Sequence, residues 1–307
     1  MQVLYFLESL RNPVTDVIFA AVTYLGDEAA FLAAALVLYW CVDKTAAYYL
    51  AAIGFSGTAL NQTLKMMFRV PRPWDLDPAF TIVESARAAA TGYSFPSGHT
   101  QNAVGIWGGL AMARRERWVR ILCIVAVLAV PFSRMYLGVH TPMDVGVSTV
   151  LAVTLVFLYY PLYRHTQGSL GALLGLLTPS VLLCIAALVL LSLLSVPADA
   201  LSYLHEANEN LCKLLGASLA MLASAIVDRR WLHFETRAPW YVQILKAVLG
   251  VALVLGLKAA LKPLFALFLP VGIADFLRYF LTVCAAGILW PMTFPYFAKM
   301  QNKKNEE

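Results

Sequence analysis

The sequence predicts an all-α protein, a polytopic bundle of transmembrane helices, and three observations support this prediction. Of its 307 residues, 60% are hydrophobic and only 13% are charged, and the mean hydropathy is +0.70. A soluble domain is about half apolar and about one quarter charged, and a single globular core could not hide this apolar excess from water. The apolar residues also form long runs between short polar connections, so lipid is the expected solvent.

About ten helical segments are predicted, since a spanning helix needs roughly 20 apolar residues. They are 13–26, 28–42, 45–68, 98–113, 118–138, 141–163, 168–196, 208–228, 241–269 and 273–298. The first two are short, and Gly26-Asp27 between them indicates a turn, so together they are expected to form a tilted hairpin. The residues before Asn12-Pro13 predict a short amphipathic helix that lies on the membrane surface.

All strong motifs of the sequence lie in its first half, which predicts two regions. Residues 1–166 are expected to form a six-helix core, and residues 167–307 to add about four further membrane helices. The Gly-rich stretch 164–175 is the expected boundary. No motif in the second region indicates its role.

Basic residues in the short connections predict the orientation of the bundle. If the ten helices alternate in direction, one face carries Lys44, Arg114, Arg115, Arg117, Arg120, Arg164, Arg229, Arg230, Lys299, Lys303 and Lys304. The positive-inside rule places that face and both termini in the cytoplasm, and the long segment 69–97 on the outer face of the cytoplasmic membrane. The same bias explains the net charge of +5, so no nucleic-acid partner is expected.

Three polar clusters stand where helices of the first half reach the outer face. They contain, in chain order, Lys65, Arg72, Ser97, Gly98, His99, Arg134, His140 and Asp144. Permanent charges at a membrane boundary are costly and therefore indicate a functional site. Arginine and lysine suit phosphate oxygens, and a helix that begins at Gly98 after a serine hydroxyl favours an anion. These groups predict a cradle for one phosphoryl group.

Two histidines and a carboxylate complete the predicted chemistry. His140 and Asp144 share one helical face, so the carboxylate can fix the tautomer of the ring and leave a nitrogen lone pair as nucleophile. His99 is then free to protonate the departing oxygen as general acid. No cluster of acidic, histidine or cysteine residues remains for a metal, and the five scattered cysteines form no CxxC motif. Neither a metal nor another cofactor is expected, because the cations stabilise the transferred group.

The motifs themselves resemble a known family. Lys65-x6-Arg72-Pro73, Pro96-Ser97-Gly98-His99 and Ser133-Arg134-x5-His140-x3-Asp144 resemble, in order and spacing, the three-part signature of the type 2 phosphatidic acid phosphatases. The site of that family is similar to those of vanadium haloperoxidases and bacterial acid phosphatases. The resemblance covers about residues 1–166. It implies His140 as nucleophile, His99 as acid, Asp144 as the orienting group, the other five residues as phosphate ligands, and an active site at the outer membrane face.

Three cations in the second region allow two interpretations. Lys258 and Lys262 share a helical face, and Arg278 lies in the first turns of the last helix, on the same side of the membrane as the catalytic cluster. They could form a second contact for an anionic headgroup. Alternatively, the lysines snorkel to the interface and Asp275 pairs with Arg278.

The sequence therefore predicts a metal-independent integral membrane lipid phosphatase that works through a phosphohistidine. Its expected partners are membrane lipids and a lipid phosphate, such as undecaprenyl pyrophosphate, phosphatidylglycerophosphate, phosphatidate or diacylglycerol pyrophosphate. A lipid phosphotransferase would share the first step, and a non-catalytic binding protein or flippase could retain the cradle. The presence of both histidines argues against the latter, and the many membrane segments argue against a vanadate-dependent oxidase. The sequence leaves the physiological lipid and the oligomeric state open.

Overall fold

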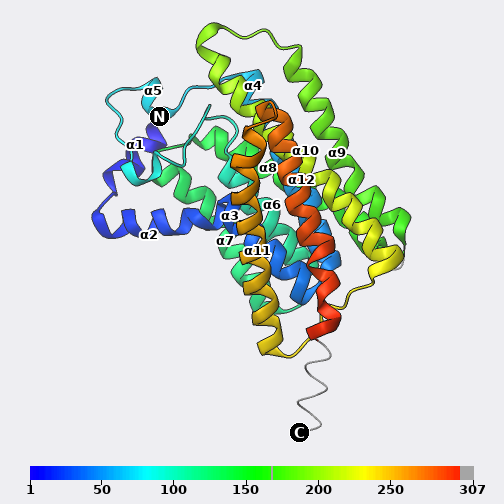
Figure 1. Cartoon of the computed structure of the whole chain (residues 1–307). Coiled ribbons are helices and arrows are strands. Elements are labelled where there is room, and N and C mark those ends of the chain that lie inside the picture. Colours follow the sequence, from blue (N-terminus) through cyan, green and yellow to red (C-terminus); the bar gives the residue numbers. More distant parts are fainter. Residues whose placement is uncertain (167–168, 298–307) are drawn as a thin grey trace.

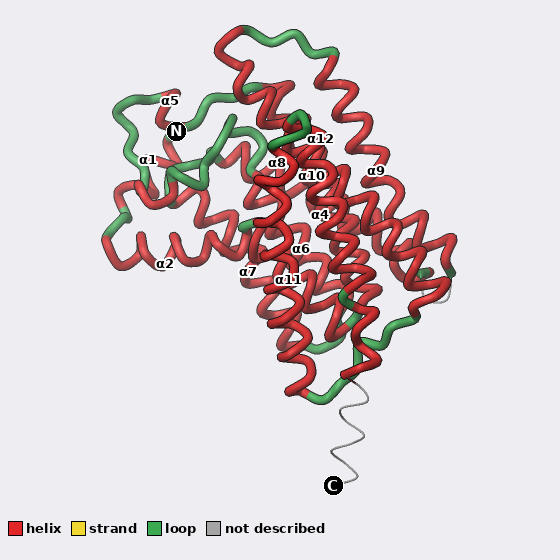
Figure 2. The backbone as a smooth tube through the Cα atoms, viewed as in Figure 1, coloured by secondary structure: helices red, strands yellow, loops and turns green. Residues whose placement is uncertain are grey.

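The computed structural model describes residues 1–166 and 169–297, and every regular element in these ranges is helical (Figures 1 and 2). The predicted all-α bundle is confirmed, and each of the ten predicted segments overlaps a helix in the described ranges. The α-helices are α1 (Gln2–Ser9), α2 (Pro13–Thr23), α3 (Glu28–Val37), α4 (Lys44–Phe68), α5 (Pro73–Leu76), α6 (Gly98–Ala113), α7 (Arg117–Tyr136), α8 (Pro142–His165), α9 (Leu170–Ser192), α10 (Leu201–Val227), α11 (Trp240–Ala266) and α12 (Val271–Cys284). Short 3₁₀ or π helices extend several of them. Examples are the 3₁₀ helix η1 (Tyr24–Gly26) and the π helices η2 (Leu38–Val42) and η6 (Ala285–Leu289).

Side-chain caps mark where the central helices begin. The Asp43 carboxylate accepts hydrogen bonds from the backbone of Thr45 and Ala46 at 2.9 and 3.0 Å, which starts α4. Ser97 caps α6, and Thr141 caps α8 with proline at the first helical position. Such caps satisfy backbone N–H groups that have no partner within the helix. The two caps of α6 and α8 also belong to the polar clusters singled out in the sequence, so these clusters sit at helix ends.

Helix α4 lies at the centre of the bundle. It packs against α6 and α8 from the first half and against α9 and α10 from the second half. Its buried face is built of small and aromatic residues, and Tyr49 donates to the carbonyl of Val156 on α8 at 2.7 Å. The later helices therefore pack directly on the core instead of forming a separate bundle (Figure 1). The predicted boundary next to residue 167 adjoins residues 167–168, which lie outside the described residues, and it stays a prediction.

Six helical segments are long and apolar enough to cross a membrane, which confirms a multi-pass membrane protein. They are Arg117–Tyr136, Pro142–His165, Leu170–Ser192, Ala198–Leu232, Trp240–Ala266 and Val271–Phe297. Helices α4 and α6 are more polar because each carries amides among its apolar residues, for example Asn61 and Gln101. Both amides are at most 3% exposed, so these two helices present little polar surface to lipid.

The predicted hairpin of 13–26 and 28–42 is wrong. The two pieces are bent by 53° at Gly26-Asp27 and do not fold back on each other. Both ends of α2 contact the last turn of α7: Thr15 and Tyr136 share a hydroxyl contact of 2.6 Å, and Arg134 donates to Thr23 at 2.9 Å. Helix α2 therefore runs along one face of the bundle. Helix α3 with η2 then crosses to the other face beside α4.

This bend changes the predicted topology. In the described residues, the segments that run from one face to the other are α3 with η2, α4, α6, α7, α8, α9, α10, α11 and α12. Their number is odd, so the two ends of this series lie on opposite faces. Helix α1 lies on the face that carries segment 69–97, where Tyr5 donates to Asp77 at 2.6 Å and Arg11 to the carbonyl of Tyr136 at 2.9 Å. Helix α12 runs from this face to the opposite one. The prediction of both termini on one face is thus wrong for the described chain, and Lys299, Lys303 and Lys304 lie outside the described residues.

The predicted clustering of basic connections is confirmed for the residues that can be placed. On the face opposite segment 69–97, Lys44 forms an ion pair with Asp228 at 2.7 Å, and Arg229 donates to the carbonyl of Thr166 at 2.9 Å. A hollow on the same face is lined by Asp43, Arg114, Arg115, Arg120 and Arg164. The two faces of the bundle therefore differ in charge.

Candidate active site

A polar cavity of about 230 Å³ lies at the 69–97 face, where α4 ends and α6 begins. Five of the eight residues predicted for the core site line it: Lys65, Arg72, Gly98, His99 and His140. The other three, Ser97, Arg134 and Asp144, are at most 1% exposed. Helix ends and turns from separate parts of the first half thus converge on one space, as the sequence predicted.

His140 sits in the turn between α7 and α8, with one ring nitrogen held by an arginine. Nη1 of Arg72 lies 3.1 Å from Nε2 of His140. A guanidinium can only donate, so Nε2 is the acceptor and the proton of the neutral ring resides on Nδ1. Burial, with the positive charges of Arg72, Arg134 and Lys65, holds the pKa of His140 well below its usual range. The ring is therefore neutral at physiological pH, with a lone pair on Nε2.

The carboxylate of Asp144 lies on the other side of this ring, together with a serine that the sequence did not single out. Oδ2 of Asp144 is 3.6 Å from Nδ1 of His140, longer than a hydrogen bond. Oγ of Ser94 donates to the same carboxylate oxygen at 2.6 Å and lies 3.5 Å from Nδ1. The backbone N–H of Thr141 donates to Oδ2 at 2.7 Å. The carboxylate is thus fixed by two donors and directed at the protonated nitrogen.

Three cations surround the cavity without a carboxylate partner. In the part of the chain that the structure describes, none of Lys65, Arg72 and Arg134 takes part in an ion pair. The ammonium of Lys65 donates to the carbonyl of Tyr93, and Arg72 donates to the carbonyls of Gly92 and Val139 at 3.0 Å each. Burial lowers the pKa of Arg72 to about 10, so it remains charged at neutral pH.

Arg134 is the most enclosed of the three cations. It is 0% exposed and donates from Nη1 to Thr23, while its Nε and Nη2 have no partner among the described residues. A buried guanidinium with two unused donors is costly unless an anion completes it. This is the strongest local sign that an anionic group belongs beside the cavity.

The start of α6 forms the floor of the cavity. The Ser97 hydroxyl accepts from the N–H of Thr100 at 3.4 Å, and the Pro96 carbonyl accepts from Asn61 at 3.3 Å. A Cβ at Gly98 would come near only one atom, Oδ1 of Asn61, at 3.8 Å. Packing does not require glycine here, so the missing side chain leaves space for a ligand at the N-terminus of the helix, where anions are favoured.

His99 faces the cavity from the same helix turn. Its Nε2 lies 3.9 Å from Oδ2 of Asp27, the residue at the bend between α2 and α3. A Cβ on Gly26 would stand 2.6 Å from the His99 carbonyl, so only glycine allows this approach. The bend that the sequence predicted as a hairpin turn therefore places a carboxylate beside His99.

Little in the amino-acid sequence points to Ser94 or Asp27 as site residues. Ser94 lies in the irregular segment 69–97, and its partners are close to it only because its N–H donates to the carbonyl of Val70 at 2.8 Å, pairing the two ends of that segment. Asp27 has the sequence signature of a helix cap, and its side chain accepts from the N–H of Ala29. Its second role depends on tertiary contact.

The structure does not bring the three cations predicted in the second region into this cavity. Arg278 lies 2.5 Å from Asp275, which is also 3.4 Å from Lys213, as the alternative interpretation proposed. The ammonium of Lys258 lies 5.1 Å from the ring centre of Tyr279, and Lys262 is exposed. Within the described ranges, no group of three histidine, cysteine or acidic residues is arranged to hold a metal ion.

Taken together, the fold and the site define a multi-pass membrane protein with a buried cationic cavity that presents two imidazoles to an anionic group. Residues 45–167 match the PAP2 superfamily, and residues 212–302 match the transmembrane extension of PAP2 superfamily phosphatases. The chain belongs to the PAP2 superfamily. The predicted enzyme class, hydrolysis of lipid phosphates, is confirmed by this membership.

Similar proteins are named as phosphatases of different lipids. The chain is 32% identical to undecaprenyl-diphosphatase BcrC of Bacillus subtilis over 50% of this chain and 77% of the relative. It is 28% identical to phosphatidylglycerophosphatase B of the same organism, over 48% and 75%. It is 27% identical to a probable sphingosine-1-phosphate phosphatase of Dictyostelium discoideum, over 76% of this chain but only 57% of that relative. No solved structure matches the chain.

Proposed function

We propose that the chain removes a phosphoryl group from a membrane lipid at the outer membrane face, with His140 as nucleophile and without a metal ion. The observation that carries the proposal is the contact between Nη1 of Arg72 and Nε2 of His140 at the wall of the polar cavity. It joins a neutral nucleophile and a phosphate-binding cation in one place.

The first step would be attack of the Nε2 lone pair of His140 on phosphorus. The P–O bond to the lipid breaks as the N–P bond forms, and the lipid oxygen takes a proton from His99. Asp144 stabilises the positive charge that develops on the ring of His140. The cations around the cavity stabilise the phosphoryl oxygens in the transition state, which is the main requirement of phosphoryl transfer.

The second step would be hydrolysis of the phosphohistidine. The neutral His99 accepts a proton from water as the water oxygen attacks phosphorus, and the N–P bond returns its electron pair to His140. Inorganic phosphate leaves and both histidines regain their starting forms. Oδ2 of Asp27 lies 3.9 Å from Nε2 of His99, where its charge would offset part of the repulsion between the cations of the cavity and the protonated ring that the first step needs.

The charge difference between the faces supports an outer-face site. Basic residues line the face opposite segment 69–97, which the positive-inside rule assigns to the cytoplasm. The cavity opens on the other face, so the substrate headgroup is expected in the outer leaflet. With this orientation α1 lies outside, and the chain first reaches the cytoplasm at the end of α3 with η2.

The relatives suggest the substrate class. Undecaprenyl diphosphate and phosphatidylglycerophosphate are the lipids implied by the names of two bacterial relatives, and both present a terminal phosphate on a long hydrocarbon chain. Water as acceptor gives a phosphatase, whereas a second lipid as acceptor would give a phosphotransferase.

The test is release of inorganic phosphate from these two lipids by the purified full-length protein in EDTA, with acid-labile labelling followed in parallel. The wild type is expected to release phosphate and to form a labelled intermediate, and His140→Ala to lose both by more than about 10³-fold. His165→Ala is the matched control, since His165 is on the opposite face and bonds only its own helix at Pro161. Label transferred to a lipid acceptor would indicate a transferase, and absence of both release and label in the wild type would contradict the proposal.

A further inference from the structure

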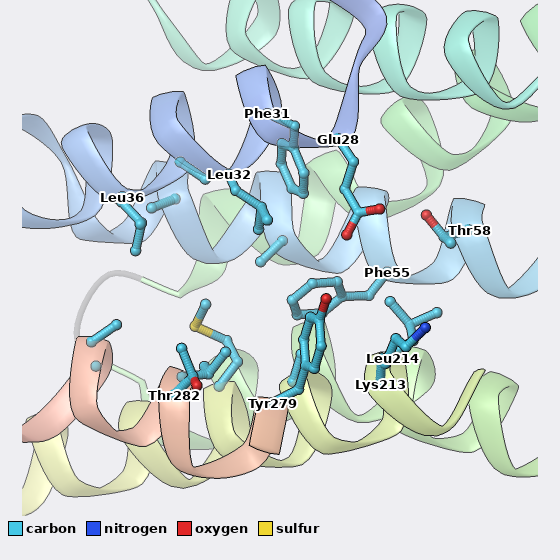
Figure 3. A pocket seen from close by; sticks show the side chains of 18 of the residues that line it. Glu28, Phe31, Leu32, Leu36, Phe55, Thr58, Lys213, Leu214, Tyr279 and Thr282 are labelled. Atoms are coloured by element: carbon cyan, nitrogen blue, oxygen red, sulfur yellow. The ribbon is translucent and has the colours of Figure 1, made fainter. Parts of the chain in front are cut away.

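A second, larger cavity lies beside the site and is mainly apolar. It encloses about 350 Å³ between α3, α4, α10 and α12, within the size range of ligand pockets. Figure 3 shows Phe31 and Leu32 of α3 on one side, Tyr279 and Thr282 of α12 on the other, and Phe55 of α4 between them. The first region of the chain thus builds one wall and the second region the facing wall.

This cavity adjoins the catalytic cavity. The two share five lining residues, all of them polar: Glu28, Thr58, Gln62, Asn102 and Asn210. Figure 3 shows Glu28 and Thr58 together at one end of the apolar space, with Lys213 nearby. The shared residues therefore form a polar throat, with cations and imidazoles on one side and hydrocarbon side chains on the other.

The apolar cavity is also long enough for a lipid chain. Its lining follows α4 from Gln62 at the throat to Ala47, about 22 Å of helix at 1.5 Å per residue. One leaflet of a bilayer has a hydrocarbon depth of roughly 15 Å. A chain whose phosphate lies at His140 could therefore extend along α4 to the far end of the cavity.

We propose that this cavity binds the hydrocarbon chain of the lipid phosphate, and that the C-terminal extension acts as its outer wall. The inference rests on the proposed function and adds a role for α10 and α12, which contain no catalytic motif. The small residues Ala217 and Ala51 leave the space between the walls open, because they lie opposite each other beside Phe55. Chain-length selectivity then depends on residues of the extension.

The test compares a long-chain lipid phosphate in mixed micelles with a short-chain, water-soluble phosphoester. Ala217→Phe places a ring in the cavity from the extension, and Leu32→Trp fills it from the core side. Each is expected to lower kcat/KM for the long-chain substrate by about 10-fold or more, since displacing even two methylenes has this effect. The rate with the short substrate should change less than about 2-fold, which also shows that each variant is folded.

The matched control is Ala252→Phe, which adds the same ring to an exposed position of α11 outside both cavities. It should leave both substrates unaffected. If both filling variants process the long-chain substrate as the wild type does, the inference is wrong, although the proposed function stands. If the wild type hydrolyses neither substrate, the proposed function itself fails.

Discussion

The two regions of this chain treat buried charge in different ways. In the first region, Arg134 is fully enclosed with two unused donors, and Arg72 has carbonyls, a neutral imidazole and the ring of Trp74 beside it but no carboxylate. In the second region, Arg278 pairs with Asp275. Buried Lys246 there lies over the ring of Phe294, 4.2 Å from its centre, and donates to a backbone carbonyl at 3.3 Å.

This contrast indicates which buried charges are expected to have a functional role. A cation that already has a carboxylate beside it contributes to packing and gains little from a ligand. A buried cation without a counter-charge costs free energy until an anion arrives, so it is kept for binding. The unpaired cations Lys65, Arg72 and Arg134 all stand at or next to helix ends around one cavity.

The sharpest test of the contrast compares alanine substitutions of an unpaired and a paired arginine. Arg134→Ala is expected to lower kcat/KM by about 10²- to 10³-fold, because the proposed mechanism uses its unpartnered Nε and Nη2 donors to stabilise the transferred phosphoryl group. Arg278→Ala is the control and should retain at least about half of the wild-type rate with a water-soluble phosphoester. Equal losses in the two variants would show that the pairing pattern does not separate function from packing.

Removal of the carboxylate in the second region should affect stability instead of rate. Asp275→Asn leaves Arg278 and Lys213 facing each other without compensation, and is expected to lower the free energy of unfolding by roughly 2–4 kcal/mol. Thermal unfolding in detergent measures this effect. The rate with a water-soluble phosphoester at a temperature well below the transition should not change, and a large loss of rate there would assign Asp275 to the site.

A moderate effect is expected at the serine that the sequence did not reveal. Ser94→Ala removes one of the two donors that fix the Asp144 carboxylate beside His140, and should lower kcat/KM about 10-fold by loosening the ring. Ser148→Ala is the control, because its hydroxyl bonds only the carbonyl of its own helix at Asp144. A kcat/KM for Ser94→Ala equal to that of the wild type would remove Ser94 from the orienting group.

The rate should not fall with decreasing pH where an ordinary histidine titrates. The pKa of His140 is held well below 6.5, so protonation removes the nucleophile only when the pH falls through that lowered value. Corrected for the titration of the substrate phosphate, with a pKa of about 6, kcat/KM should show no loss as pH falls past 6.5, because protonation of the general acid His99 can only favour the first step there. A loss of rate centred near pH 6.5 would contradict a neutral, buried His140.

The smallest effect concerns the predicted second headgroup contact. Lys262 is exposed and outside both cavities, so Lys262→Gln should leave the preference between a lipid monophosphate and a lipid diphosphate unchanged. Relative kcat/KM for the two substrates measures this preference. Lys258→Gln provides the comparison, since Lys258 lines the apolar cavity. A clear change of this preference in Lys262→Gln would support the hypothesis of a second headgroup contact.

Much of the site was predictable because its residues follow strict spacing at helix ends. Gly98 opens a helix as predicted, and His140 and Asp144 lie four residues apart, although His140 is in the turn before α8 and not on the helical face that the spacing predicted. Ser94 and Asp27 were not predictable, since one is in an irregular segment and the other has the signature of an ordinary helix cap. Their positions follow from contacts with residues far away in the sequence.

Hydropathy and motif spacing are local properties, so they are sufficient to predict a membrane bundle with a polar cluster suited to phosphate. The path of the first helices depends on tertiary packing, since the contacts of α2 with Phe132 and Tyr136 accompany a 53° bend where a hairpin was predicted. The position of the extension depends on tertiary packing as well. The apolar cavity is formed by side chains from α3, α4, α10 and α12 that face one another, so it cannot be predicted from the sequence of any single helix.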